Sequence, residues 1–143
     1  MQRQLFLLIF VILIGNTFSL AQNNYVIVIH GGAGVMSREK MNDELQAKYK
    51  AKLIDALTFG ENMLKEGASA TDVVVKVINV MKDSPLFNAG KGAVFTHDGF
   101  NELDASIMEG KTMNAGAVAG VRDIKNPINA ARAVMGYKNL SIA

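Results

Sequence analysis

Pro85-Leu86-Phe87-Asn88-Ala89-Gly90-Lys91-Gly92, continued by Ala93-Val94-Phe95 and then by Glu102-Leu103-Asp104-Ala105-Ser106-Ile107-Met108-Glu109-Gly110, decides how this chain of 143 residues folds. A proline fixes the backbone, the glycines that follow free it, and alternating apolar residues come next. This combination is costly unless a loop must hold a particular shape. The stretch therefore predicts a shaped loop that leads into a sheet.

Upstream of this stretch the pattern predicts one strand and two helices. Tyr25–Ile29 is a β-branched run without a polar residue, typical of a strand covered on both faces, and His30–Gly34 is a tight loop after it. Apolar residues at helical spacing predict a helix from about Asn42, with Gly67 at its C-terminal cap. Ser69 and Asp72 form a capping box for a second helix. Its valine-rich body would also suit a strand, but the cap and the polar positions favour the helix.

Downstream, the pattern predicts a small sheet and a last helix. Ala93–Phe95 and Leu103–Met108 are expected to pair as a hairpin across the Asp98-Gly99 turn. Ala115–Val121 is a third strand whose small residues imply that another element packs closely on it. Asn126-Pro127 starts a helix that runs through Met135. The sequence predicts an α+β fold whose sheet needs further strands, so we expect an incomplete domain.

Composition excludes several classes of function. The net charge of +2 comes from 15 basic and 13 acidic residues that are interspersed, so we expect no nucleic-acid partner. Cysteine is absent, which excludes disulfides and thiol nucleophiles. Two histidines, His30 and His97, are too few for a histidine-built metal site, and His97 reads as an exposed loop residue.

The first 21 residues have the features of a secretory signal peptide. Arg3 gives a positive start, Leu5–Ile14 is apolar, and Ser19-Leu20-Ala21 offers small residues for cleavage. We expect residues 1–21 to be this signal, residues 22–143 to be one partial domain, and the protein to be exported to a periplasm or secreted. An uncleaved membrane anchor is the alternative, although the apolar run is short for a span.

Three groups of residues are candidates for chemistry, and each has a plain structural alternative. The His30–Gly34 loop can bring backbone amides to negative charge, or it can be only a sharp turn. The Met81–Gly92 loop can aim carbonyl oxygens at a hard cation, or it can be an ordinary connection. Glu102, Asp104 and Glu109 can serve acid–base chemistry, but a solvated or hydrogen-bonded structural role is at least as consistent with their positions.

Four motifs in series resemble the plant-type asparaginase and isoaspartyl peptidase family over about Tyr25–Met135. They are His30-Gly31-Gly32-Ala33-Gly34, Pro85-Leu86-Phe87-Asn88-Ala89-Gly90-x-Gly92, Glu102-Leu103-Asp104-Ala105-x-Ile107-Met108-x-Gly110 and Ala115-Gly116-Ala117-Val118-Ala119-Gly120-Val121. The resemblance implies an N-terminal-nucleophile hydrolase with an αββα sandwich, of which this chain would be the N-terminal half. Such a precursor cuts itself into α and β subunits that stay associated, and the αβ pair dimerises.

The resemblance also implies a mechanism and supporting residues. A threonine freed by self-cleavage, with its α-amino group as base, attacks asparagine or a β-aspartyl dipeptide. Thr58, Thr71, Thr96 and Thr112 all lack the Gly-Thr-Val-Gly context of that processing site, so we expect no catalytic residue in this chain. Gly31 and Gly32 would belong to the mobile loop beside the cleavage site, and Asn88 would lie near the nucleophile.

The same resemblance implies a structural sodium ion and no catalytic cofactor. Its ligands would be backbone carbonyls of the loop, in the order Met81, Lys82, Ser84, Phe87, Ala89 and Lys91. Lys91 departs from the small apolar residue common there, and its ammonium would weaken cation binding. Two other readings stay open: a noncatalytic remnant or binding module, and a lipase-like hydrolase, whose Gly-x-Ser-x-Gly partner motif the chain lacks.

Overall fold

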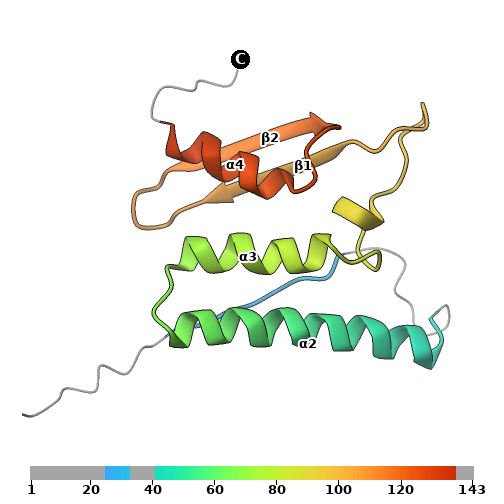
Figure 1. Ribbon diagram of the computed structural model, residues 1–143, viewed down its shortest axis with the longest axis horizontal. Helices are drawn as coiled ribbons and strands as arrows, with labels where there is room; N and C mark the ends of the chain where they lie inside the picture. Colours follow the sequence, from blue (N-terminus) through green and yellow to red (C-terminus); the bar gives the residue numbers. More distant parts are fainter. Residues whose placement is uncertain (1–24, 33–40, 138–143) are drawn as a thin grey trace, which may run out of the picture.

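The computed structural model describes residues 25–32 and 41–137. Three α-helices, a short 3-10 turn and two strands follow one another along these residues, which confirms the α+β class. In Figure 1, α2 lies at the bottom, α3 lies above it, and the sheet and α4 lie on top. The elements are α2 (Asp43–Lys65), α3 (Ala70–Lys82), η1 (Gly90–Gly92), β1 (Leu103–Met108), β2 (Ala115–Val121) and α4 (Pro127–Gly136).

Both long helices begin and end at the residues that the sequence predicts. The Asn42 side chain accepts the backbone N–H of Leu45 at 2.8 Å, and Gly67, with φ of +84°, lies just after α2. Ser69 Oγ accepts the N–H of Asp72 at 3.1 Å at the start of α3. The valine-rich segment is therefore a helix, and α3 ends before the Ser84-Pro85 break.

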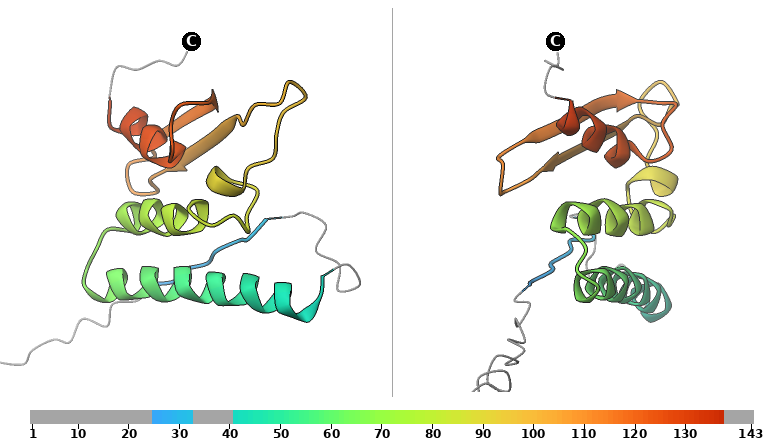
Figure 2. Two further views of the ribbon diagram at one scale, coloured as in Figure 1. Left: turned by 45° about the vertical axis from the view of Figure 1, so that its right-hand side comes forward. Right: turned by 60° about the vertical axis from the view of Figure 1, so that its left-hand side comes forward.

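The helix α3 lies between two apolar clusters because its buried valines face opposite sides. Val73 and Val77 pack with Ala56 of α2, whereas Val75 packs with Ile107 of β1 and with residues of α4. Positions 73 and 77 lie one turn apart on the same face, and position 75 lies on the other face. One helix thus joins the α2 layer to the sheet layer (Figure 2).

The sheet differs from the predicted hairpin. The strand β1 pairs antiparallel with β2, whereas Ala93–Phe95 forms no strand and leaves Val94 and Phe95 largely exposed. The prediction was wrong because two apolar residues and a turn do not specify which strand supplies the ladder. The Asp98-Gly99 turn itself is confirmed, since Gly99 has φ of +79° and its N–H donates to Thr96 O at 3.1 Å.

The helix α4 covers one face of this sheet at very close range. A Cβ atom on Gly116 would collide with the backbone of Ala131 and Met135 in α4, so only glycine allows this approach. This confirms the close packing predicted from the small residues of β2. The predicted start at Asn126-Pro127 is also confirmed, but the Asn126 side chain makes no capping hydrogen bond.

The predicted strand Tyr25–Ile29 is not formed. Residues 25–32 run alongside α2 and α3 without a ladder (Figure 1), and their exposure alternates. Ile27 and Ile29 pack on the α2–α3 cluster, whereas Val26 and Val28 are 88% and 85% exposed. A continuous apolar run predicts cover on both faces, yet here only one face is covered.

Residues 1–24, 33–40 and 138–143 lie outside the description, and with them the predicted signal peptide, Ala33 and Gly34. Within the described ranges, no helix combines the length and the apolar character that a membrane crossing requires.

Candidate functional site

A groove of about 860 Å³ brings together the two loops that the sequence analysis singled out. One wall comes from the segment before α2, and the others come from the two long helices and the loop after α3. Its lining residues are Ile27, Val28, Ile29, His30, Gly31, Gly32, Met41, Leu45, Tyr49, Val74, Val77, Ile78, Met81, Lys82, Leu86, Phe87, Asn88, Ala89 and Gly92. The groove is a concave, mainly apolar site with few polar groups, as ligand sites usually are.

The His30–Gly32 turn is held by a hydrogen bond to the imidazole. The backbone N–H of Gly32 donates to His30 Nδ1 at 3.1 Å, and Gly32 has φ of +117°, a conformation that favours glycine. Gly31 lies against the side chains of Phe87 and Leu53, where an added Cβ would be 3.4 Å from the Phe87 ring. Packing at Gly31 therefore fixes this turn to the loop after α3.

Asn88 lies on the exposed rim of this groove, and its side chain holds the loop together. Asn88 Oδ1 accepts the backbone N–H of Val94 at 2.9 Å. Nearby, Asn101 Nδ2 donates to the carbonyls of Ala93 and Val94 at 2.9 and 3.1 Å. Two asparagine side chains thus replace the ladder that the predicted strand Ala93–Phe95 would have supplied.

The loop after α3 crowds carbonyl oxygens around two glycines. A Cβ atom on Gly90 would lie 2.6 Å from the carbonyl oxygen of Lys82, and one on Gly92 would lie 2.6 Å from that of Pro85 and would also collide with that of Phe87. Glycine is required at both positions because these oxygens occupy the space. Pro85 was not among the predicted carbonyl ligands.

Six carbonyls are predicted to hold a cation, and three of them accept a backbone hydrogen bond within the loop. Met81 O accepts from Ser84, Phe87 O accepts from Ala89 at 2.7 Å, and Ala89 O accepts from Gly92 at 3.3 Å. A carbonyl oxygen has two lone pairs, so each keeps capacity for a cation. The other three predicted ligands are the carbonyls of Lys82, Ser84 and Lys91.

Two buried polar side chains stand at the start of this loop. Ser84 is 6% exposed, and its Oγ accepts the N–H of Leu86 at 3.3 Å. Lys82 is 8% exposed, and burial lowers the pKa of its ammonium group, while the nearby Asp104 carboxylate acts in the opposite sense. The sequence analysis counted Lys82 among the polar positions that favour the helix and took its carbonyl as a ligand, but it did not predict that the side chain is buried. The signal was present, because position 82 continues the apolar face of Val75 and Ile78.

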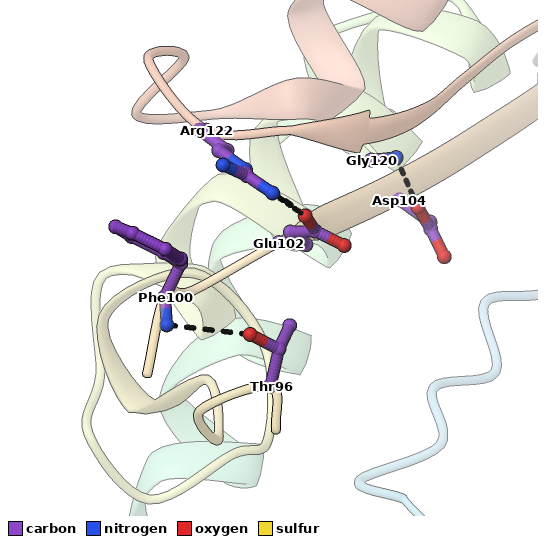
Figure 3. A network of polar contacts seen from close by, with 6 residues as sticks. All are labelled: Thr96, Phe100, Glu102, Asp104, Gly120 and Arg122. Atoms are coloured by element: carbon purple, nitrogen blue, oxygen red, sulfur yellow. Dashed lines mark hydrogen bonds and ion pairs between the residues drawn. The ribbon is translucent and has the colours of Figure 1, made fainter. Parts of the chain in front are cut away.

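The three acidic candidates are not brought together into an acid–base site. Figure 3 shows that Glu102 pairs with Arg122, whose guanidinium also lies 4.8 Å from the centre of the Phe100 ring. Asp104 Oδ1 accepts the N–H of Gly120 at 2.8 Å. Glu109, at the hairpin turn, accepts from Thr112 Oγ1 at 2.5 Å and from Thr71 Oγ1 at 3.4 Å. Each carboxylate therefore has the structural role that the sequence analysis gave as its alternative.

Among the described residues, neither histidine belongs to a group that could hold a metal ion. His97 is exposed in the turn, as expected. Within residues 25–32 and 41–137, no group of three or more histidine, aspartate or glutamate side chains is arranged to hold a metal ion.

Comparison with known proteins gives the four motifs their context. A family model described as "Asparaginase" matches residues 23–140. The chain is 49% identical over 113 residues to an isoaspartyl peptidase of Salmonella typhimurium, which covers 79% of this chain and 36% of the relative. It is 50% identical over 110 residues to an isoaspartyl peptidase of Escherichia coli, covering 77% and 34%. A plant-type L-asparaginase of Pyrococcus furiosus is 49% identical over 109 residues, covering 76% and 34%.

The chain thus spans about a third of the length of these curated relatives. The family match covers all four motifs, including both loops that meet at the groove. The chain belongs to the asparaginase family that comprises plant-type L-asparaginases and isoaspartyl peptidases.

Proposed function

We propose that this chain forms the N-terminal, α-subunit part of an exported N-terminal-nucleophile amidohydrolase. The whole enzyme hydrolyses L-asparagine, β-aspartyl dipeptides, or both. The observation that carries the proposal is the groove in which the His30–Gly32 turn meets the Asn88 loop. The names of the relatives, isoaspartyl peptidase and plant-type L-asparaginase, support the same reaction class.

In this proposal the chain positions groups and does not supply the nucleophile. A threonine from the β-subunit part attacks the side-chain carbonyl of the substrate, and water then hydrolyses the acyl-enzyme. Gly31 and Gly32 shape the turn beside the cleavage site. Asn88, whose Oδ1 holds the Val94 N–H, keeps its Nδ2 group available to the nucleophile. The two subunits form one αββα sandwich, and two αβ pairs form the dimer.

A sodium ion fits the loop after α3 by the chemistry of its donors. Two of the proposed ligands, the carbonyl oxygens of Lys82 and Phe87, crowd against Gly90 and Gly92, and carbonyl oxygens are hard ligands of the kind that such cations prefer. The proposed ligands are the carbonyls of Met81, Lys82, Ser84, Phe87, Ala89 and Lys91, and the ion would stiffen the loop that carries Asn88. The positive charges of Lys82 and Lys91 oppose its binding.

The first test is to read the coding region beyond Ala143 and to express the whole precursor. A Gly-Thr-Val-Gly-type segment followed by splitting into two subunits, with a new N-terminal threonine, supports the proposal. Release of ammonia from asparagine, or of the second residue from a β-aspartyl dipeptide, identifies the substrate class. An immediate stop codon, or a precursor that never splits, favours the alternative of a noncatalytic remnant or binding module.

A further inference from the structure

The hydrogen bond within the His30–Gly32 turn fixes the chemical form of the imidazole. The backbone N–H of Gly32 donates to His30 Nδ1 at 3.1 Å. An imidazole nitrogen accepts a hydrogen bond only when it carries no proton, so His30 is neutral in this turn and has its proton on Nε2. A protonated imidazole has a donor on both nitrogens and would set its own N–H against that of Gly32. The turn is therefore closed by this bond only while His30 is neutral.

The same kind of turn is usually closed by asparagine or aspartate. In those turns the side-chain oxygen on Cγ accepts the backbone N–H of the residue two positions further on. His30 Nδ1 is also bonded to Cγ and accepts from the same position. The difference is that a histidine changes its charge between about pH 5 and 8, whereas an amide oxygen stays an acceptor throughout this range. The choice of histidine thus makes the closure of the turn sensitive to pH.

Packing fixes only the first of the two glycines in the turn. A Cβ atom on Gly31 would lie 3.4 Å from the Phe87 ring and 3.5 Å from the Leu53 side chain, so this residue lies against both the loop after α3 and α2. A Cβ atom on Gly32 would meet nothing within 4 Å. Its φ of +117° is open to glycine at little cost, and sterics alone do not select it. The imidazole therefore holds the part of the turn that packing leaves free.

The charged groups around the turn offer a protonated imidazole no partner. No carboxylate lines the groove in the described part of the chain, and its titratable residues besides His30 are Tyr49 of α2 and Lys82 of α3. On the turn of α2 that packs against this segment, Lys52 and Asp55 pair with each other at 2.9 Å. The loop on the opposite side, residues 85–90, is uncharged. Loss of the hydrogen bond on protonation is thus not offset by an ion pair with these groups.

We propose that His30 is a positioning residue: its neutral imidazole holds the Gly31–Gly32 turn in the form that the precursor needs for self-cleavage, and its protonation releases the turn. This inference rests on the proposed function, in which the turn lies beside the cleavage site, and adds a control by pH to it. His30 touches no reacting atom and carries no step of the reaction. Self-cleavage therefore slows in mildly acidic surroundings.

The test measures the rate at which the full-length precursor splits, at both ends of the range from about pH 5 to 8. His30→Asn keeps an acceptor on Cγ that does not titrate, and His30→Leu removes the acceptor. At the basic end, wild type and His30→Asn should split equally fast, and His30→Leu should be slower by about two- to tenfold, as for one lost hydrogen bond. At the acid end, the wild type should fall to the rate of His30→Leu, while His30→Asn keeps its advantage.

Rates are compared as ratios at each pH, because the titration of groups common to all variants then cancels. His97→Asn removes an exposed histidine that does not line the groove, and its rate should follow that of the wild type at every pH. A ratio of wild type to His30→Asn that stays constant with pH overturns the inference. So does a His30→Leu precursor that splits as fast as the wild type at the basic end.

The imidazole nitrogen signals of the precursor, labelled with a nitrogen isotope in histidine, give a second readout that needs no cleavage. The signal that is absent from His30→Asn belongs to His30, and at the basic end it should show the proton on Nε2. A proton on Nδ1 overturns the inference. A precursor that never splits at any pH contradicts the proposed function and with it the link to self-cleavage, and the nitrogen signals then still show whether His30 closes the turn.

Discussion

At the scale of single residues, several polar side chains act through the backbone. Asn88 and Asn101 hold an irregular segment in place through Val94 and Ala93, and His30 holds its own turn through Gly32. The motif pattern predicted that Asn88 and the glycines matter, and the structure places them at one groove. The motif pattern did not predict the hydrogen bond from the Val94 N–H to Asn88 Oδ1. Such a bond depends on the conformation of the loop and leaves no periodic pattern in the sequence.

The hydrogen bond between Asn88 and Val94 gives a first prediction. Asn88→Ala removes the acceptor of the Val94 N–H, so that amide should exchange with deuterium faster, by the equivalent of about 0.5–1.5 kcal/mol of local opening. Asn88→Asp keeps an acceptor oxygen and should retain protection. Exchange at Val94 that is equally slow in Asn88→Ala would show that this hydrogen bond does not hold the loop.

At the scale of the elements, the helices could be predicted from the sequence, whereas the pairing of the strands could not. Both long helices were predicted because their caps and the spacing of apolar residues lie within a few residues of sequence. Ala93–Phe95 and Tyr25–Ile29 were predicted as strands and are not, because a strand exists only with a partner that may lie far along the chain. The strands β1 and β2 are neighbours along the chain, yet their pairing was not predicted either, nor was the bulge at Gly120 that Asp104 stabilises.

The start of α3 gives a prediction about pH. Hydrogen bonds from Ser69 and Arg132 lower the pKa of Asp72 below its ordinary value of 3.8, so the ionised carboxylate favours the folded state. This stabilisation is fully present above the unfolded pKa and is lost as the pH falls through the folded pKa. At pH 7, Asp72→Asn should therefore show faster hydrogen exchange in the first turn of α3. The gap between wild type and variant should close at strongly acid pH.

The test has a clear control in the same region. Asp55→Asn, at the exposed Lys52 pair on α2, should leave exchange in α3 unchanged. A gap at Asp72 that persists unchanged in strong acid would contradict the assignment, because a protonated carboxyl can no longer hold Arg132 as an ion pair.

At the scale of the whole molecule, the described part of the chain leaves much apolar surface uncovered. Val26, Val28, Val94 and Phe95 are 65–88% exposed, and Met108 on the open face of the sheet is 56% exposed. Surfaces of this kind mark interfaces or cause aggregation when they stay bare. The chain spans about a third of its relatives, and we propose that the remaining part of the enzyme covers this surface.

The uncovered surface gives a prediction for residues 22–143 expressed alone. This fragment should aggregate or bind a hydrophobic dye strongly, whereas the same residues within the precursor should not. Size-exclusion chromatography and dye fluorescence provide the measurement. A soluble monomer that unfolds cooperatively would contradict it.

The close approach of α4 to the sheet gives the last prediction. In the precursor, Gly116→Ala should lower the free energy of unfolding by about 1–3 kcal/mol, because the new methyl group overlaps the backbone of Ala131 and Met135. Gly110→Ala meets no atom within 4 Å and should be nearly neutral. Urea unfolding of both variants gives the comparison, and equal losses would mean that the helix yields freely.

The close contact of Gly116 with Ala131 and Met135 also couples the sheet to α3 through α4. A methyl group at Gly116 would press on the backbone of a helix that also carries Asn129 and Arg132, the partners of Asn79 and Asp72 on α3. A push that starts at β2 would therefore be felt at both ends of α3, including the end next to the groove. A substitution that touches no residue of the groove could thus change its shape.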